Sequence, residues 1–100
     1  MDYSVETSGQ TTTLILGGQF TSKDRREFDD VIKSIVEKDG STVEVNMASL
    51  SYLDSVGLGM LITLRAEVEM AEKSIALISP RGDVKDALYM SCFDRLFDIK

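Results

Sequence analysis

The hydrophobic positions of residues 51–71 recur at the spacing of an α-helix. The segment reads SYLDSVGLGMLITLRAEVEMA. Residues spaced three and four apart within it are Leu58, Leu61, Ile62, Arg65, Val68 and Ala71. Such spacing places side chains on one face of a helix. We therefore predict a long helix that begins near Ser55 and around which the rest of the domain is organised.

A second periodic stretch precedes it. One face of this predicted helix carries Phe28, Val31, Ile32, Ile35 and Val36. Thr21 and Asp24 have the spacing of a capping box, in which each side chain accepts from the backbone of the other. Asp39 and Gly40 are typical of a helix C-terminus. The sequence thus predicts a helix bounded at both ends.

Strand patterns surround the two helices. We predict a hairpin from Tyr3–Glu6 and Thr11–Leu16, joined at Ser8-Gly9-Gln10 and ended by Gly17-Gly18. Residues 42–47 alternate between apolar and polar side chains, which is typical of a strand buried on one face.

The last third of the chain adds one strand, one helix and a tail. Residues 74–79 read as a buried strand, and Val84, Ala87 and Leu88 mark a shorter third helix. Apolar residues of the tail are expected to dock on the core: Phe93, Leu96, Phe97 and Ile99. Strand–helix–strand units need right-handed crossovers and parallel strands. We predict one α/β domain over residues 1–100, with a mixed four- to five-stranded sheet, an N-terminal antiparallel hairpin and three to four helices packed mainly on one face.

Composition limits the classes of function. The net charge of −6 is spread over both halves of the chain, so there is no basic patch for nucleic acid. We expect no signal peptide and find no apolar segment of membrane-spanning length, and the single Cys92 fits a reducing compartment. We expect a cytoplasmic protein that binds neither nucleic acid nor membrane.

The chain contains no histidine. Its absence removes the usual general base and the commonest metal ligand, so we expect no catalytic residues, metal or cofactor. Gly57-Leu58-Gly59 resembles the start of a dinucleotide-binding turn. However, Ile62 stands at the third glycine position, and we expect a loop from Ala48 to Ser55 where that motif has a tight turn. A small enzyme or nucleotide binder is therefore the least favoured class.

Ser55 is expected at the mouth of the central helix, beside Asp54. Its hydroxyl suits a helix cap, and unpaired N–H groups there also favour a phosphate carried by the serine. Gly57 and Gly59 each cost a helix about 1 kcal/mol relative to Ala. Either close approach by another protein or tight internal packing explains them.

The segment Tyr52–Leu61 resembles the signature of the STAS domain of bacterial anti-sigma factor antagonists. The likeness covers essentially the whole chain: Leu16–Phe20 looks like the family's strand ending in a Gly-x-Leu turn, Val43–Met47 like its central strand, and Asp94–Phe97 like its tail. The resemblance implies a STAS fold and a protein-binding switch instead of an enzyme.

In such antagonists the serine after the motif's aspartate is phosphorylated by an anti-sigma factor that is also a serine kinase, and a serine phosphatase reverses this. The unmodified form captures the anti-sigma factor and frees the sigma factor for transcription. The matching residue here is Ser55. We expect the partner to contact Thr21, Ser22, Asp54, Val56, Gly57, Gly59, Met60 and Thr63. Some relatives also serve a second signalling enzyme.

Three residues depart from the family pattern. Val56 replaces a second serine, and Thr21 stands where many members carry an aspartate near the partner site. Cys92 stands where the third helix often ends in glycine, which costs up to about 2 kcal/mol if the backbone there is left-handed.

Simpler structural roles remain for several of these residues. Ser55 is also suited to act only as a helix cap, and Asp54 only to interact with the helix dipole. Met60 and Met70 are suited to fill the core as well as to form an interface. Cys92 is expected to be half-buried, and Arg25-Arg26 to be a solvated helix face. A second functional hypothesis is a constitutive STAS scaffold or regulatory subunit of a larger signalling or transport complex, without the switch.

Overall fold

The computed structural model describes all of residues 1–100 and contains a five-stranded sheet in the order β1-β2-β3-β4-β5. In chain order the elements are β1 (Asp2–Ser8), β2 (Thr11–Phe20), η1 (Ser22–Asp24), α1 (Arg25–Glu37), β3 (Thr42–Leu53), α2 (Ser55–Met70), β4 (Ser74–Ile78), α3 (Gly82–Met90), η2 (Phe93–Arg95) and β5 (Asp98–Ile99). The elements η1 and η2 are short 3-10 helices.

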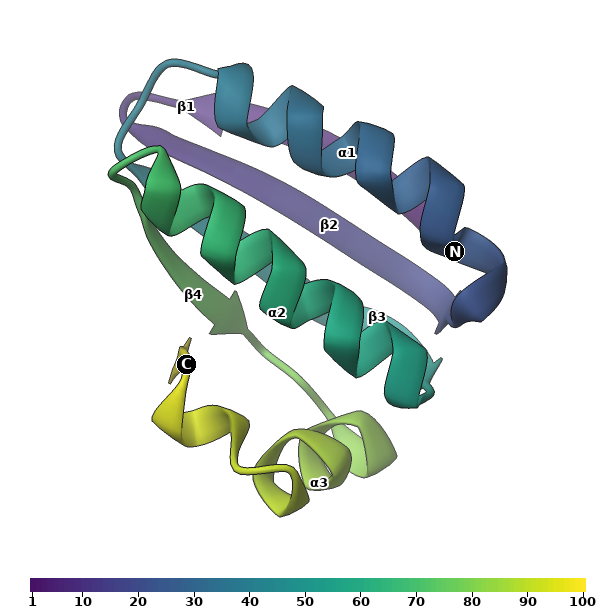
Figure 1. Ribbon diagram of the computed structural model, residues 1–100. Coiled ribbons are helices and arrows are strands. Elements are labelled where there is room, and N and C mark those ends of the chain that lie inside the picture. The colour runs from purple at the N-terminus through teal and green to yellow at the C-terminus, as the bar shows by residue number, and fades with distance from the viewer.

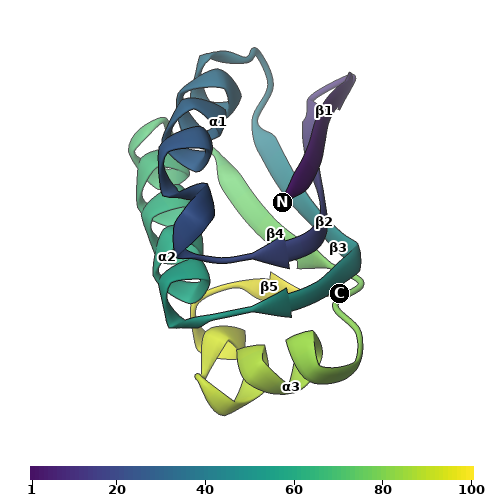
Figure 2. The same cartoon turned by 90° about the vertical axis from the view of Figure 1, so that its right-hand side faces the viewer.

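The sheet is mixed, as predicted. Strand β1 pairs antiparallel with β2, and β2 to β5 run parallel to one another. Helices α1 and α2 lie side by side over one face of the sheet, and α3 lies at one end of it (Figure 1). The view in Figure 2 shows α1 and α2 on the same side of the strands. The predicted α/β fold with an N-terminal hairpin is therefore confirmed.

The core lies between the sheet and the α1–α2 pair. Alternate residues of β2 and β3 point into it, including Leu14, Val43 and Val45, which are completely buried. The face of α1 predicted from its periodicity supplies Phe28, Val31, Ile32 and Ile35. The ring of Phe28 meets that of Phe20 edge-on at 4.7 Å between centroids, which anchors the start of α1 to the end of β2.

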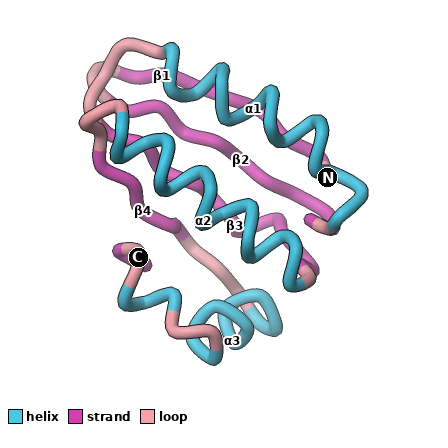
Figure 3. Tube along the Cα trace, viewed as in Figure 1, coloured by secondary structure: helices cyan, strands magenta, loops and turns pink.

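Two predicted strand ends are wrong. Gly17 and Gly18 do not end β2, which continues to Phe20 with irregular register around these glycines. Gly18 has φ +73°, a conformation that only glycine adopts easily, so the strand bends there without stopping. Beside it β3 also continues to Leu53, and the expected loop from Ala48 to Ser55 shrinks to Asp54 alone (Figure 3).

The predicted buried face of α2 is partly wrong. Leu61 and Val68 are buried as expected, but Ile62 is 42% exposed and Ala71 is exposed. The residues that meet the core are Gly57, Met60, Leu61, Leu64 and Val68. Because α2 carries apolar residues on several sides, periodicity alone did not identify the side that packs on the sheet.

The C-terminal segment packs less completely than expected. Phe93 and Phe97 stack at 5.5 Å between ring centroids and are buried, whereas Leu96 is 37% exposed. Cys92, expected to be half-buried, is exposed and has φ 60°, in the left-handed region. Cys92 lies in the turn between α3 and η2, where the residue stays exposed. None of the helices is long and apolar enough to span a lipid bilayer.

Candidate functional site

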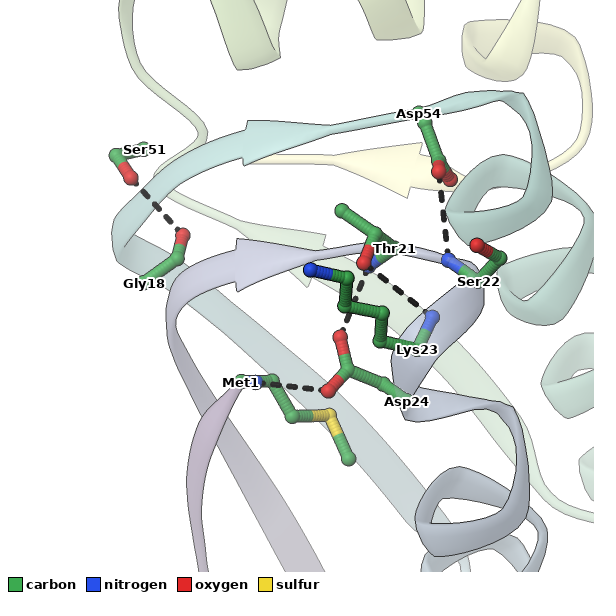
Figure 4. Close-up of polar contacts among 8 residues, drawn as sticks. All are labelled: Met1, Gly18, Thr21, Ser22, Lys23, Asp24, Ser51 and Asp54. Atoms are coloured by element: carbon green, nitrogen blue, oxygen red, sulfur yellow. Dashed lines mark hydrogen bonds and ion pairs between the residues drawn. The ribbon is translucent and has the colours of Figure 1, made fainter.

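Two helix starts meet at one edge of the sheet. Since β2 and β3 are parallel neighbours, their carboxyl ends lie together, and Phe20 pairs with Leu53. The backbone N–H of Asp54 donates to the carbonyl oxygen of Phe20 at 3.3 Å. The N–H of Ser22 in turn donates to Asp54 Oδ2 at 3.3 Å (Figure 4). The entrances to α1 and α2 are thus held together.

Asp54 is the N-cap of α2. Its extended backbone places Oδ1 2.8 Å from the N–H of Gly57, which otherwise lacks a partner in the first turn. Both carboxylate oxygens therefore accept from backbone N–H groups. Ser55 becomes the first helical residue and is exposed to solvent. Ser55 thus lies where it was predicted, at the mouth of the helix and in contact with solvent.

The two glycines of α2 differ in their surroundings. A methyl group added to Gly57 would lie 2.6 Å from the carbonyl oxygen of Phe20, so Gly57 permits close packing on β2. The same methyl group on Gly59 would meet nothing within 4 Å. Tight internal packing therefore explains why position 57 is a glycine. At position 59 the glycine leaves the helix backbone open to approach from outside.

A groove runs between the first turns of α1 and α2 and has a volume of about 450 Å³. It is lined by Arg25, Asp29, Ile32, Ser55, Val56, Gly59, Met60 and Thr63. Met60 lines the groove although it is only 7% exposed, so it belongs to both the core and the groove. The structure thus brings Ser55, Val56, Gly59, Met60 and Thr63 to one groove, whereas Thr21, Ser22, Asp54 and Gly57 do not line it.

The α1 wall of the groove was missed by sequence reasoning. Arg25, expected to be only a solvated position, and Asp29 are four residues apart and line the groove with Ile32. The only sequence signal for this wall was a basic and an acidic residue one turn apart at the start of a helix. Periodicity gives no information about which other helix such a pair faces.

Thr21 and Asp24 form the predicted capping box. The N–H of Lys23 donates to Thr21 Oγ1 at 3.4 Å, and the N–H of Thr21 donates to Asp24 Oδ2 at 2.9 Å. The other oxygen of Asp24 accepts from the amino group of Met1 at 2.8 Å (Figure 4). Thr21 therefore has a local structural role beside the two helix starts.

The ion pair changes the pKa values of both its members. Burial raises the pKa of Asp24, but hydrogen bonds from the Met1 amine and the Thr21 N–H outweigh it, so this pKa lies below that of an ordinary aspartate. The hydrogen bond to Asp24 raises the pKa of the Met1 amine above its ordinary value. Both shifts favour the charged pair.

Comparisons with known proteins give a consistent result. Residues 3–98 match the family model described as "Mlab, STAS domain". The chain is 36% identical over 93 residues to the STAS-domain containing protein PA14_20770 of Pseudomonas aeruginosa (strain UCBPP-PA14), covering 91% of this chain and 89% of that protein.

Solved structures share the fold at low sequence identity. The anti-sigma factor antagonist SpoIIAA in its unphosphorylated form matches with a TM-score of 0.81 at 19% identity, over 99% of this chain and 88% of that one. The Bacillus cell fate determinant SpoIIAA in the phosphorylated form gives 0.74 at 18% identity, over 99% and 91%. An anti-sigma factor antagonist from Mycobacterium paratuberculosis gives 0.85 at 15% identity, over 98% and 83%. With a family model spanning residues 3–98 and a five-stranded sheet matching these antagonists, the chain belongs to the STAS domain family.

Proposed function

We propose that this protein is an anti-sigma factor antagonist, a non-catalytic binding switch that phosphorylation of Ser55 turns off. The observation that carries the proposal is the exposed hydroxyl of Ser55 at the first position of α2, on the edge of the α1–α2 groove. Likeness to SpoIIAA, whose structures include a phosphorylated form, supports it. The partner is an anti-sigma factor that is also a serine kinase, acting in the cytoplasm, where ATP is available.

The unmodified groove offers a partner small and apolar contacts. Gly59 leaves backbone uncovered, and Val56 and Met60 supply apolar surface. A partner side chain that enters here meets no charge on the α2 wall, since Ser55, Gly59 and Thr63 are neutral. Binding in this state sequesters the anti-sigma factor and releases its sigma factor.

Phosphorylation changes this surface without changing the fold. The kinase transfers the γ-phosphoryl group of ATP to Ser55 Oγ, ADP leaves, and the hydroxyl proton passes to solvent or to a base of the kinase. A serine phosphatase restores the hydroxyl by hydrolysis and releases inorganic phosphate. The phosphoserine brings about −1.5 to −2 charges to the start of α2, where the helix dipole favours negative charge.

A partner shaped for the neutral groove must displace water from this phosphate to bind. Desolvating an unpaired charge costs several kcal/mol, which is comparable to the whole binding energy of a moderate complex. Phosphorylated protein therefore releases the partner while its core, which Ser55 does not enter, stays folded.

Capture experiments from the native host test the switch. Ser55→Ala as bait should retain an anti-sigma factor, identified by mass spectrometry and by its binding to a sigma factor, and Ser55→Asp should retain less of it at an unchanged melting temperature. Ser34→Asp is the matched control, because Ser34 is exposed on α1 and lines no part of the groove. It adds the same charge and should bind like the unmodified protein.

Equal capture of one partner by Ser55→Ala and Ser55→Asp would reject the switch and favour the constitutive subunit. Phosphorylation itself is checked by intact mass after incubation with the captured kinase and ATP. A gain of one phosphoryl group that Ser55→Ala abolishes is expected. A gain that persists in Ser55→Ala would place the modification elsewhere.

A further inference from the structure

Arg25 and Ser55 occupy equivalent positions on the two helices that form the groove. Each is the first residue of its helix, Arg25 of α1 and Ser55 of α2. The bond from Ser22 N to Asp54 Oδ2 links η1, which leads into α1, to the N-cap of α2. The side chains of Arg25 and Ser55 line the same groove. Helices packed side by side have axes about 8–10 Å apart, a gap that an arginine and a phosphoserine from opposite walls can bridge.

Arg25 has no ionic partner in the unmodified protein. The ion pairs of the structure are Met1 with Asp24 and Arg65 with Glu69. Asp29 lies one turn away on the same groove wall but is not within ion-pair distance of Arg25. Asp54 forms no ion pair with Arg25 either, and its two oxygens accept from backbone N–H groups.

The other cations near the helix starts lie elsewhere. Lys23 lines a different hollow, with Met1, Gly18 and Gln19. Arg26 follows Arg25 on α1 but lines no part of the groove. Arg25 is therefore the one basic side chain on the groove that Ser55 borders.

We propose that Arg25 is the counter-ion of phosphorylated Ser55, so that modification closes the groove with an ion pair between α1 and α2. Phosphate and guanidinium match in geometry and form charge-assisted, often bidentate hydrogen bonds. The phosphate carries more charge than Asp29 and so becomes the preferred partner of Arg25.

The Arg25–phosphoserine pair adds a second reason why the phosphorylated protein does not bind its partner. The groove is then occupied by the protein's own side chains, and a partner must break an ion pair as well as desolvate a phosphate. A Ser55→Asp side chain is shorter and carries a single charge, so it imitates the charge but not this closure. This inference rests on the proposed phosphorylation of Ser55.

The test uses protein made with phosphoserine inserted at position 55 during translation, so that neither kinase nor partner is needed. Phosphorus NMR gives the second pKa of the phosphate group. Arg25 lowers this pKa, while Asp29 and Asp54 raise it. Replacing Arg25 by Gln should therefore raise the pKa by about 0.5, because a nearby opposite charge favours the ionised phosphate. The matched control Arg26→Gln removes the same charge outside the groove and should leave the pKa nearly unchanged.

A direct readout accompanies the titration. In the phosphorylated protein the Nε–H resonance of Arg25, but not that of Arg26, should shift relative to the unmodified protein. Equal phosphate pKa values in the Arg25→Gln and Arg26→Gln proteins, or an Arg25 resonance that does not respond, would overturn the counter-ion assignment. Such a result leaves the switch itself standing, since the switch is judged by partner capture.

Discussion

The Asp54 carboxylate accepts a hydrogen bond from the backbone N–H of Ser22, 32 residues earlier in the chain, and so joins the beginning of α2 to η1, the short 3-10 helix that leads into α1. The same carboxylate caps α2 through Gly57. One side chain thus both caps α2 and links its N-terminus to the segment that leads into α1. Changes at Asp54 should therefore affect the cap and this link together.

Replacing Asp54 by Ala should lower the free energy of unfolding by about 1 kcal/mol, the usual cost of removing an N-cap. Asp54→Asn keeps a capping oxygen and should lose much less. Urea unfolding followed by circular dichroism compares the two. Identical midpoints for the Ala variant and the unmodified protein would show that the cap contributes nothing.

Gly57→Ala should destabilise the domain. The new methyl group would lie 2.6 Å from the backbone oxygen of Phe20, which cannot move without shifting β2. Overpacking costs about 1–3 kcal/mol, and a rigid backbone contact belongs at the upper end of that range. The gain in helix propensity, about 1 kcal/mol, is smaller. A net loss of unfolding free energy is expected in urea titrations.

Gly59→Ala should do the opposite. Its methyl group meets nothing within 4 Å, so only the helix-propensity gain of up to about 1 kcal/mol remains. If the groove binds the partner, the same methyl group should weaken capture even as the melting temperature rises. A variant that is both less stable and fully active in capture would contradict this reading of Gly59.

Cys92→Gly should stabilise the domain by about 1 kcal/mol, because Cys92 is held at φ 60° and a left-handed conformation strains any residue with a Cβ atom. Cys92→Ala is the matched control: it removes the thiol but keeps the Cβ atom, so no gain is expected. Thermal unfolding of the two variants separates backbone strain from the effect of the thiol.

The Met1–Asp24 pair should make stability depend on pH at both ends of a window. The pKa of Asp24 is lowered in the folded state, so its contribution is present above the ordinary aspartate value of about 4 and is lost as the pH falls through the lower folded value. The pKa of the Met1 amine is raised, so its contribution is present below about 8 and is lost as the pH rises through the folded value.

Asp24→Asn should flatten this profile at both ends in a chain that begins at Met1. Unfolding free energies measured across the pH range, for both proteins, check it. Asp39→Asn is the control, since Asp39 is exposed, forms no ion pair and affects the pKa of neither member of the Met1–Asp24 pair. A profile that remains unchanged in Asp24→Asn would assign the pH dependence to other groups.

Periodic patterns predicted what depends on local sequence. The buried face of α1 and the alternation of Val43, Val45 and Met47 follow from spacing, and the structure confirms them. The capping box of Thr21 and Asp24 is equally local, since its members are three residues apart. These locally encoded elements were sufficient to predict the fold class.

Non-local relationships were the ones missed. Gly17 and Gly18 look like a strand end, but pairing with β3 carries the chain through them. The side of α2 that is buried depends on how closely Gly57 approaches Phe20. Arg25 became a groove residue only because α1 packs beside α2. None of these contacts produces a periodic pattern in the sequence from which it could be predicted.

The strands lie in the sheet in the same order as in the chain, so each one pairs with the strand made just before it. Such a topology keeps relative contact order low for a sheet protein and makes loop closure between successive strands inexpensive in entropy. As the nascent polypeptide emerges from the ribosome, the hairpin can form first. Each later strand can then pair with an edge strand that is already in place. Assembly is able to follow synthesis, with no early strand left to wait for a distant partner.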